Sequence, residues 1–139
     1  DESDSDKEKQ QEKGLVGTKD AKIGTEEEAE EGWELLDAET IQNTTVVQTY
    51  LKEGSEQAIT TALNDGVIPD DYYFVRKINK VERQQVLNAN NDVVQSVYRF
   101  NLDTSNGKGT NVAVTYEVEY NEATQEGEIK NITYNAKVL

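Results

Sequence analysis

The chain has 139 residues, with 28 acidic and 14 basic side chains and a formal net charge of −14. It contains no cysteine and no histidine, which excludes disulfides, Cys/His zinc sites, thiol nucleophiles and imidazole bases. The negative charge repels phosphate backbones and anionic lipid headgroups, so we expect no nucleic-acid partner and no direct adhesion to membranes. The length predicts a single domain with a tail.

Residues 1–24 have the composition of a disordered acidic tether. The first 14 residues, D-E-S-D-S-D-K-E-K-Q-Q-E-K-G, include no apolar side chain, so they cannot offset the entropy lost on ordering. Half of the excess negative charge lies in residues 1–32, which carry 12 acidic and 5 basic side chains. An acidic interaction tail is the alternative interpretation.

The sequence also has no methionine. We therefore expect a processed product, either a trimmed chain or a secreted protein whose signal segment has been removed. No apolar run approaches the roughly 20 residues of a membrane span, so we expect any membrane attachment to lie upstream of Asp1, through a lipid anchor.

The segment T-E-E-E-A-E-E-G-W-E-L-L begins with a capping-box pattern, Thr25 followed by Glu28. This pattern predicts a short helix from Glu26, with Gly32 as its weak point. Trp33 begins the first apolar cluster. It is either a packing residue or an aromatic platform for a ligand.

Residues of about 40–63 are predicted to form an amphipathic helix, because their apolar side chains recur at spacings of three and four. Gly54 interrupts the pattern and costs about 1 kcal/mol relative to alanine, which indicates one helix with a soft spot or two helices in line. Asn64-Asp65-Gly66 ends the helix. The apolar residues are Ile41, Val46, Val47, Tyr50, Leu51, Ala58, Ile59, Ala62 and Leu63.

After the helix the apolar period changes from 3.6 to 2, which is typical of strands. Four strands are predicted at about 72–87, 93–102, 110–120 and 128–139, with turn sequences between them. Such short connections make neighbouring strands antiparallel. The predicted fold of residues 25–139 is therefore α+β, with an N-terminal helix packed on a four-stranded antiparallel meander.

The last three strands alternate apolar and polar side chains, so one face of the sheet is predicted to lie against the helix. Ile129 is out of phase with Ile132, which predicts a β-bulge near Lys130. The predicted inward rows are Val94, Tyr98, Phe100 and Leu102; Val112, Val114, Tyr116, Val118 and Tyr120; and Ile132, Tyr134, Ala136 and Val138.

The opposite face is rich in Thr and Asn and is either a solvated surface or a binding surface. As candidate binding residues we take this face together with the first hairpin. They are Arg99, Asn101, Thr115, Glu117, Thr133, Asn135, Gln84 and Gln85. The first strand also carries Arg76, Lys77, Lys80 and Arg83, which either pair with acids across the sheet or form a local anion patch.

None of the sequence patterns that could indicate catalysis or ligand binding is complete enough to predict an active site. Asp103-Thr104-Ser105-Asn106-Gly107 lacks the spacing of a calcium loop, and Gly107-Lys108-Gly109-Thr110 lacks that of a P-loop. Glu117 and Glu119 share one face, but a solvent-side pair has no pocket to raise either pKa. We therefore expect no enzyme activity, no cofactor and no metal.

A helix followed by a long-stranded antiparallel meander resembles the cystatin-like architecture, which is similar in outline to the nuclear-transport-factor-2-like (NTF2-like) fold. Cystatin inhibitors insert a Q-x-V-x-G hairpin into papain-type proteases. The first hairpin here reads Q-Q-V-L-N-A at 84–89 and lacks the glycine. The acidic stretch D-E-S-D-S-D-K-E-K-Q-Q-E-K is similar to the tether of small lipoproteins of low-GC Gram-positive bacteria, some of which carry cystatin-like domains.

These resemblances imply a non-enzymatic, secreted or lipid-anchored domain at the cell surface that binds an unidentified protein partner. The alternative function is a cystatin-type protease inhibitor. A third is an NTF2-like small-ligand binder or enzyme, with a ligand cone between helix and sheet.

Overall fold

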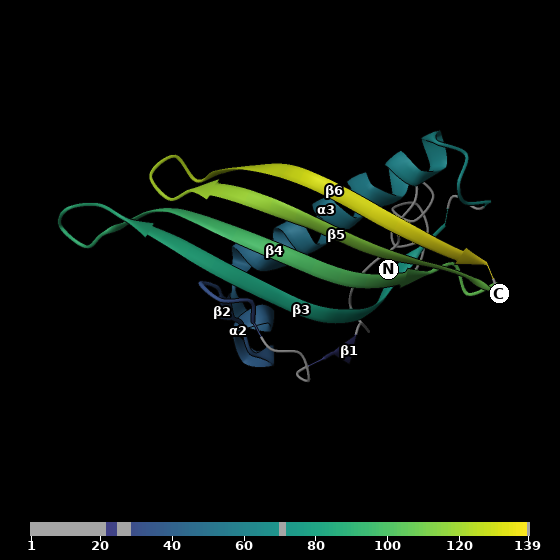
Figure 1. The fold of residues 1–139 in the computed structure, drawn as a ribbon, viewed down its shortest axis with the longest axis horizontal. Helices are drawn as coiled ribbons and strands as arrows, with labels where there is room; N and C mark the ends of the chain where they lie inside the picture. Colours follow the sequence, from purple (N-terminus) through teal and green to yellow (C-terminus); the bar gives the residue numbers. More distant parts are fainter. Residues whose placement is uncertain (1–21, 25–28, 70–71, 139) are drawn as a thin grey trace, which may run out of the picture.

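The computed structural model describes residues 22–24, 29–69 and 72–138. Two strands come first, β1 (Lys22–Ile23) and β2 (Glu34–Leu35), followed by two helices, α2 (Ala38–Asn43) and α3 (Thr45–Asn64) (Figure 1). Four long strands complete the chain: β3 (Phe74–Leu87), β4 (Val93–Ser105), β5 (Thr110–Asn121) and β6 (Glu126–Val138).

The predicted N-terminal helix on a four-stranded meander is wrong in two respects, although the α+β class remains compatible. The described residues form a six-stranded sheet with the order β1-β3-β4-β5-β6, and β2 also pairs with β3. Both additional strands precede the helices in the chain, so the helix pair is not N-terminal. Strands of two residues are too short to show an alternation of apolar and polar side chains in the sequence. They form because their backbones pair with β3.

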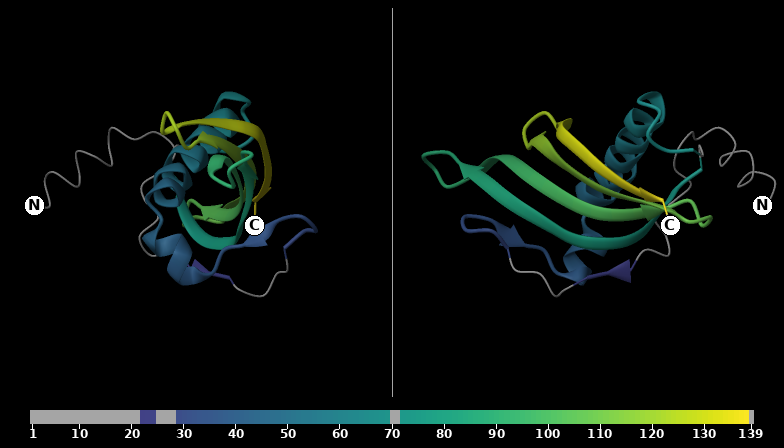
Figure 2. Two further views of the ribbon diagram at one scale, coloured as in Figure 1. Left: turned by 90° about the vertical axis from the view of Figure 1, so that its left-hand side faces the viewer. Right: turned by 45° about the vertical axis from the view of Figure 1, so that its right-hand side comes forward.

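The core lies between α3 and the four long antiparallel strands. α3 crosses one face of these strands obliquely, and the strands curve along their length (Figures 1 and 2). Its buried residues, Val47, Leu51, Ala58, Ile59 and Ala62, face the sheet's buried row. Val112, Val114, Tyr116 and Val118 of that row are fully buried. The predicted alternation is therefore present in β5.

The helical segment breaks at Thr44 and not at Gly54. Thr44 has extended backbone angles, φ −99° and ψ 112°, and separates α2 from α3. Its hydroxyl donates a hydrogen bond of 2.6 Å to the Thr40 carbonyl, as short polar side chains do at helix ends. α3 then runs without interruption through Gly54.

The short helix predicted from Glu26 is not found in residues 29–36. Its proposed cap, Thr25 to Glu28, lies outside the described residues. Beyond it, Trp33 N donates to the Glu30 carbonyl at 3.0 Å in a turn with Gly32 at φ 88°. That conformation favours glycine and stops helical propagation.

The predicted bulge near Lys130 is confirmed. Thr115 pairs with Thr133, whereas Glu117 pairs with Lys130, so two residues of β6 face one residue of β5. Asn131, one of the two, has a left-handed φ of 56°, which asparagine tolerates better than most residues. The bulge brings Ile129 and Ile132 to the same side, where both pack against the core.

Val94 was predicted to face inward, but it is 39% exposed. The β3–β4 hairpin that carries it extends beyond the part of the sheet that α3 crosses (Figures 1 and 2).

Within the described residues, no helix combines the length and the apolar character that crossing a membrane requires.

Candidate functional site

Residues 29–36, here called the strap, lie along β3 and reach over the polar face of the sheet. Glu34 and Leu35 pair with Arg83 and Glu82 in antiparallel register, and Leu36 N donates to the Val81 carbonyl at 2.9 Å. The strap therefore covers part of the polar face of β3 and β4.

Arg99 is the centre of the contact between the strap and the sheet. Its guanidinium lies 4.0 Å from the centroid of the Trp33 ring, a cation–π distance. Its Nη1 donates to the Glu30 carboxylate, and its Nε donates to Glu117 Oε2 at 3.2 Å. Partial burial opposes the charge, but the hydrogen bonds that Arg99 donates to Glu30 and Glu117 raise the pKa of Arg99 above its ordinary value.

Glu82 lies beneath this contact and is only 1% exposed. Its Oε2 accepts the backbone N–H of Glu30 at 2.8 Å. Its Oε1 lies 3.8 Å from Lys80 Nζ and 3.9 Å from Arg99 Nη1, and it accepts no hydrogen bond from the residues that the structure describes. A buried carboxylate is costly unless it is paired, so the strap's N–H and the two cations stabilise it together.

Of the four basic side chains predicted for the strand that is now β3, Arg83 has a different partner from the one expected. Arg83 Nε and Nη2 donate to Glu34 Oε1 at 3.0 and 2.8 Å. Sequence patterns predicted pairing with acids across the sheet, such as Glu117 and Glu119. Those two bind Arg99 and Lys130 instead.

Of the six candidate residues on the polar face, the structure joins two pairs, Arg99 with Glu117 and Thr115 with Thr133. Asn101 Oδ1 accepts from Asn79 Nδ2 at 3.0 Å. The Thr115 and Thr133 hydroxyls hydrogen-bond each other, and Asn135 is exposed. Thr115 also lines the same small hollow as Arg99 and Glu117.

The two hairpin candidates differ in their contacts. Gln84 Nε2 donates to the Gly32 carbonyl of the strap at 3.3 Å, whereas Gln85 is exposed. Sequence reasoning missed the roles of Glu30, Glu34 and Glu82. The signal that could have found them is Trp33, a lone aromatic residue within an acidic segment.

The strand ends that flank the β3–β4 turn carry three exposed apolar side chains. Val86, Leu87 and Val94 are 44%, 51% and 39% exposed. Val94 is the extra residue of a bulge, because Val86 pairs with Gln95 and Leu87 with Val93. Residues 84–95 contain one charged side chain, Asp92, in a chain whose net charge is strongly negative.

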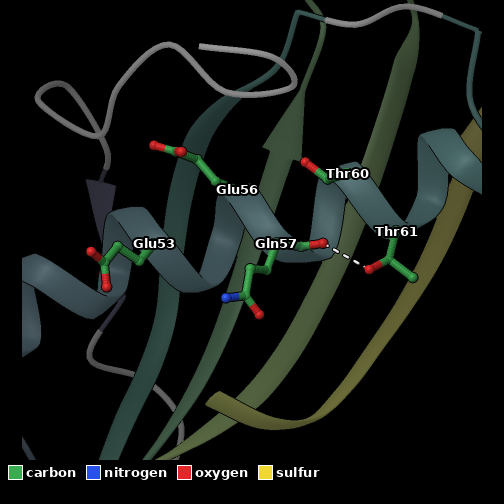
Figure 3. A pocket seen from close by; sticks show the side chains of 5 residues that line it. All are labelled: Glu53, Glu56, Gln57, Thr60 and Thr61. Atoms are coloured by element: carbon green, nitrogen blue, oxygen red, sulfur yellow. Dashed lines mark hydrogen bonds between the residues drawn. The ribbon is translucent and has the colours of Figure 1, made fainter. Parts of the chain in front are cut away.

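Three open hollows on the surface of the described residues are lined mainly by polar residues. One of about 540 Å³ lies over α3, where the side chains drawn in Figure 3 project from the helix. Another of about 420 Å³ lies at the β5–β6 turn, and one of about 90 Å³ adjoins Arg99 and Asn131. The first is lined by Glu53, Glu56, Gln57, Thr60 and Thr61.

Among the described residues, no three acidic side chains are grouped so that they could hold a metal ion. Comparisons with protein families, curated proteins and solved structures find no match to this chain. The lipoprotein resemblance and the functions inferred from sequence therefore stay predictions.

Proposed function

We propose that this chain is a non-enzymatic binding domain that recognises a protein partner through the end of the β3–β4 hairpin. The observation that supports this most directly is the exposure of Val86, Leu87 and Val94 on a projecting element. Exposed apolar clusters of this kind are typical of interaction sites, whereas single exposed apolar residues are not informative.

The arrangement of the apolar residues restricts the shape of the partner. Val86 and Leu87 are consecutive in β3, and successive side chains of a strand point to opposite faces. A flat partner surface would bury only one of them. A cleft that receives the end of the hairpin would bury both, and the low charge of residues 84–95 limits the cost of removing this segment from water.

The same hairpin favours one second candidate, protease inhibition. Gln84, Gln85 and Val86 begin the segment that resembles the inhibitory hairpin of cystatins, and this segment lies at the projecting end. Inhibition of papain by the intact chain at micromolar concentration would support this candidate, and the absence of inhibition would remove it.

A location outside the cell is part of the proposal. It is supported by the acidic, apolar-poor composition of residues 1–24, which is similar to the tethers of Gram-positive lipoproteins. The sequence of the gene ahead of Asp1 tests it: a signal segment ending in a cysteine supports lipid anchoring, and a coding sequence without any signal segment contradicts it.

A pair of matched variants tests the binding proposal. A photo-crosslinking residue placed at Gln85 should capture a specific protein in intact source cells. V86D/L87D should lose this adduct, because charged side chains oppose burial of the hairpin. The control V67D changes a valine that is also 44% exposed but lies outside the hairpin, and it should keep the adduct. Equal capture by both variants would contradict the proposal.

A further inference from the structure

We propose that the edge of β3 beneath the strap is a docking groove for an acidic, extended peptide, and that the strap is its intramolecular occupant. This proposal concerns a different surface from the β3–β4 hairpin and does not depend on the function proposed above.

The contacts of the strap show what the groove recognises. Two carboxylates four residues apart, Glu30 and Glu34, bind Arg99 and Arg83. The aromatic ring of Trp33 covers the Arg99 guanidinium. Arginine side chains form strong charge-assisted hydrogen bonds with anionic groups, here with two carboxylates, so the complementary ligand is acidic and carries an aromatic residue.

The groove also binds the backbone of an extended chain. The β3 edge pairs with Glu34 and Leu35 as strand residues, and the buried carboxylate of Glu82 accepts a backbone N–H at position 30. Addition of a strand to a sheet edge is a recurring mode of peptide recognition, in which main-chain bonds supply affinity and side chains supply specificity.

The groove side of the contact is held independently of the strap. Glu117 binds Arg99 from within the sheet, and it accepts a second hydrogen bond from Asn131 Nδ2 at 2.8 Å. Arg99 and Glu82 also face each other in the β3–β4 register. The binding side chains are therefore preorganised on long strands, which lowers the entropy lost when a ligand binds.

The strap side of the contact is weakly attached. β2 has only two residues, and the side chains of Glu30 and Glu34 are 64% and 57% exposed. Ion pairs at such exposure contribute little to stability, so residues 30–34 belong to the part of the fold that opens at low free-energy cost, whereas Leu36, which is 5% exposed, keeps the end of the strap in the core. An external peptide binds the fraction of molecules in which the strap is open, and its apparent affinity falls by that fraction.

A synthetic peptide with the sequence of residues 29–36, A-E-E-G-W-E-L-L, tests the proposal on the full chain. W33F removes the chain's one tryptophan, so fluorescence then reports the peptide alone. In W33F/E30Q/E34Q the strap is loosened, and the peptide should bind saturably and about tenfold more tightly than to W33F.

Charge-matched variants of the loosened chain separate the groove from general attraction. Adding R83Q/R99Q should weaken peptide binding about tenfold or more, because both carboxylate partners are removed. Adding R76Q/K108Q removes the same charge at exposed positions outside the strap contacts and should leave binding unchanged. Equal binding by these two variants, or no saturable binding to a folded loosened chain, would overturn the proposal.

Hydrogen exchange on the unmodified chain gives a test that does not require any variant to fold. Millimolar peptide should accelerate exchange of the Glu30 amide several-fold, because this N–H donates to the Glu82 carboxylate of β3 only while the strap is closed. Amides in the centre of β5 serve as the reference and should not change. Unchanged exchange at Glu30 would overturn the proposal.

Discussion

The ring of Tyr116 lies directly against Gly54 of α3. A β-carbon at position 54 would lie 2.1 Å from Tyr116 Cε2, which is far inside contact distance. The Tyr116 hydroxyl donates to the Tyr50 carbonyl at 2.6 Å, and its ring stacks on Phe100 with centroids 4.7 Å apart. Glycine at position 54 therefore allows a close contact between helix and sheet.

Gly54→Ala should destabilise the protein, although helix propensity alone predicts the opposite. Propensity favours alanine by about 1 kcal/mol, whereas overpacking a filled core costs about 1–3 kcal/mol. Urea unfolding followed by circular dichroism measures the balance. An increase in the free energy of unfolding would show that the Tyr116 ring moves aside freely and that its contact with α3 is not tight.

Alkaline pH should destabilise the protein partly through Tyr116. Burial raises the pKa of its phenol well above the ordinary value of 10.0. Above about pH 10 the unfolded state releases this proton while the folded state retains it, so the unfolded state binds fewer protons and stability falls as pH rises. Burial also raises the pKa of Tyr98, so part of the slope belongs to that residue.

Tyr116→Phe should therefore reduce the loss of stability above pH 10, while costing about 1 kcal/mol at neutral pH for the lost hydrogen bond. Urea unfolding at pH 8 and at pH 10.5 measures both effects. Tyr72→Phe, at a side chain that is 44% exposed, controls for the removal of one phenol. An unchanged alkaline slope in the Tyr116 variant would contradict the prediction.

Arg99→Gln should release Trp33 from the sheet without unfolding the core. Trp33 is the one tryptophan in the sequence, so its emission should shift to longer wavelength and become more accessible to acrylamide. The far-ultraviolet circular dichroism should stay unchanged. Arg99→Lys keeps the charge but loses the planar, forked guanidinium, and it should give an intermediate shift. An Arg99→Gln spectrum identical to that of the unmodified chain would refute the stacking contact.

Asn131 should tolerate glycine better than alanine. Its φ of 56° costs an alanine about 1–2 kcal/mol, whereas glycine adopts this conformation freely. Both substitutions remove the hydrogen bond to Glu117, so the difference between them isolates the backbone contribution. Chemical denaturation of the two variants measures this difference. Equal losses would show that the side-chain hydrogen bond, and not the backbone conformation, makes Asn131 favourable.

The sequence by itself determined the long regular elements. The apolar row from Val112 to Val118 predicts a half-buried strand, because side chains alternate with a period of two over its whole length. The phase change between Ile129 and Ile132 predicts the β6 bulge in the same way. These features depend on residues that are close in sequence, so the alternation of apolar and polar side chains is enough to predict them.

The tertiary structure alone decided the contacts between distant segments. Glu30 and Arg99 are 69 residues apart, and β2 is too short for its residues to show a period. Gly54 was predicted as a soft spot because helix propensity describes an isolated helix. In the folded protein, the ring of Tyr116 in β5 packs against this glycine of α3. Pairing at a sheet edge and close packing depend on three-dimensional proximity, and local sequence patterns do not encode that proximity.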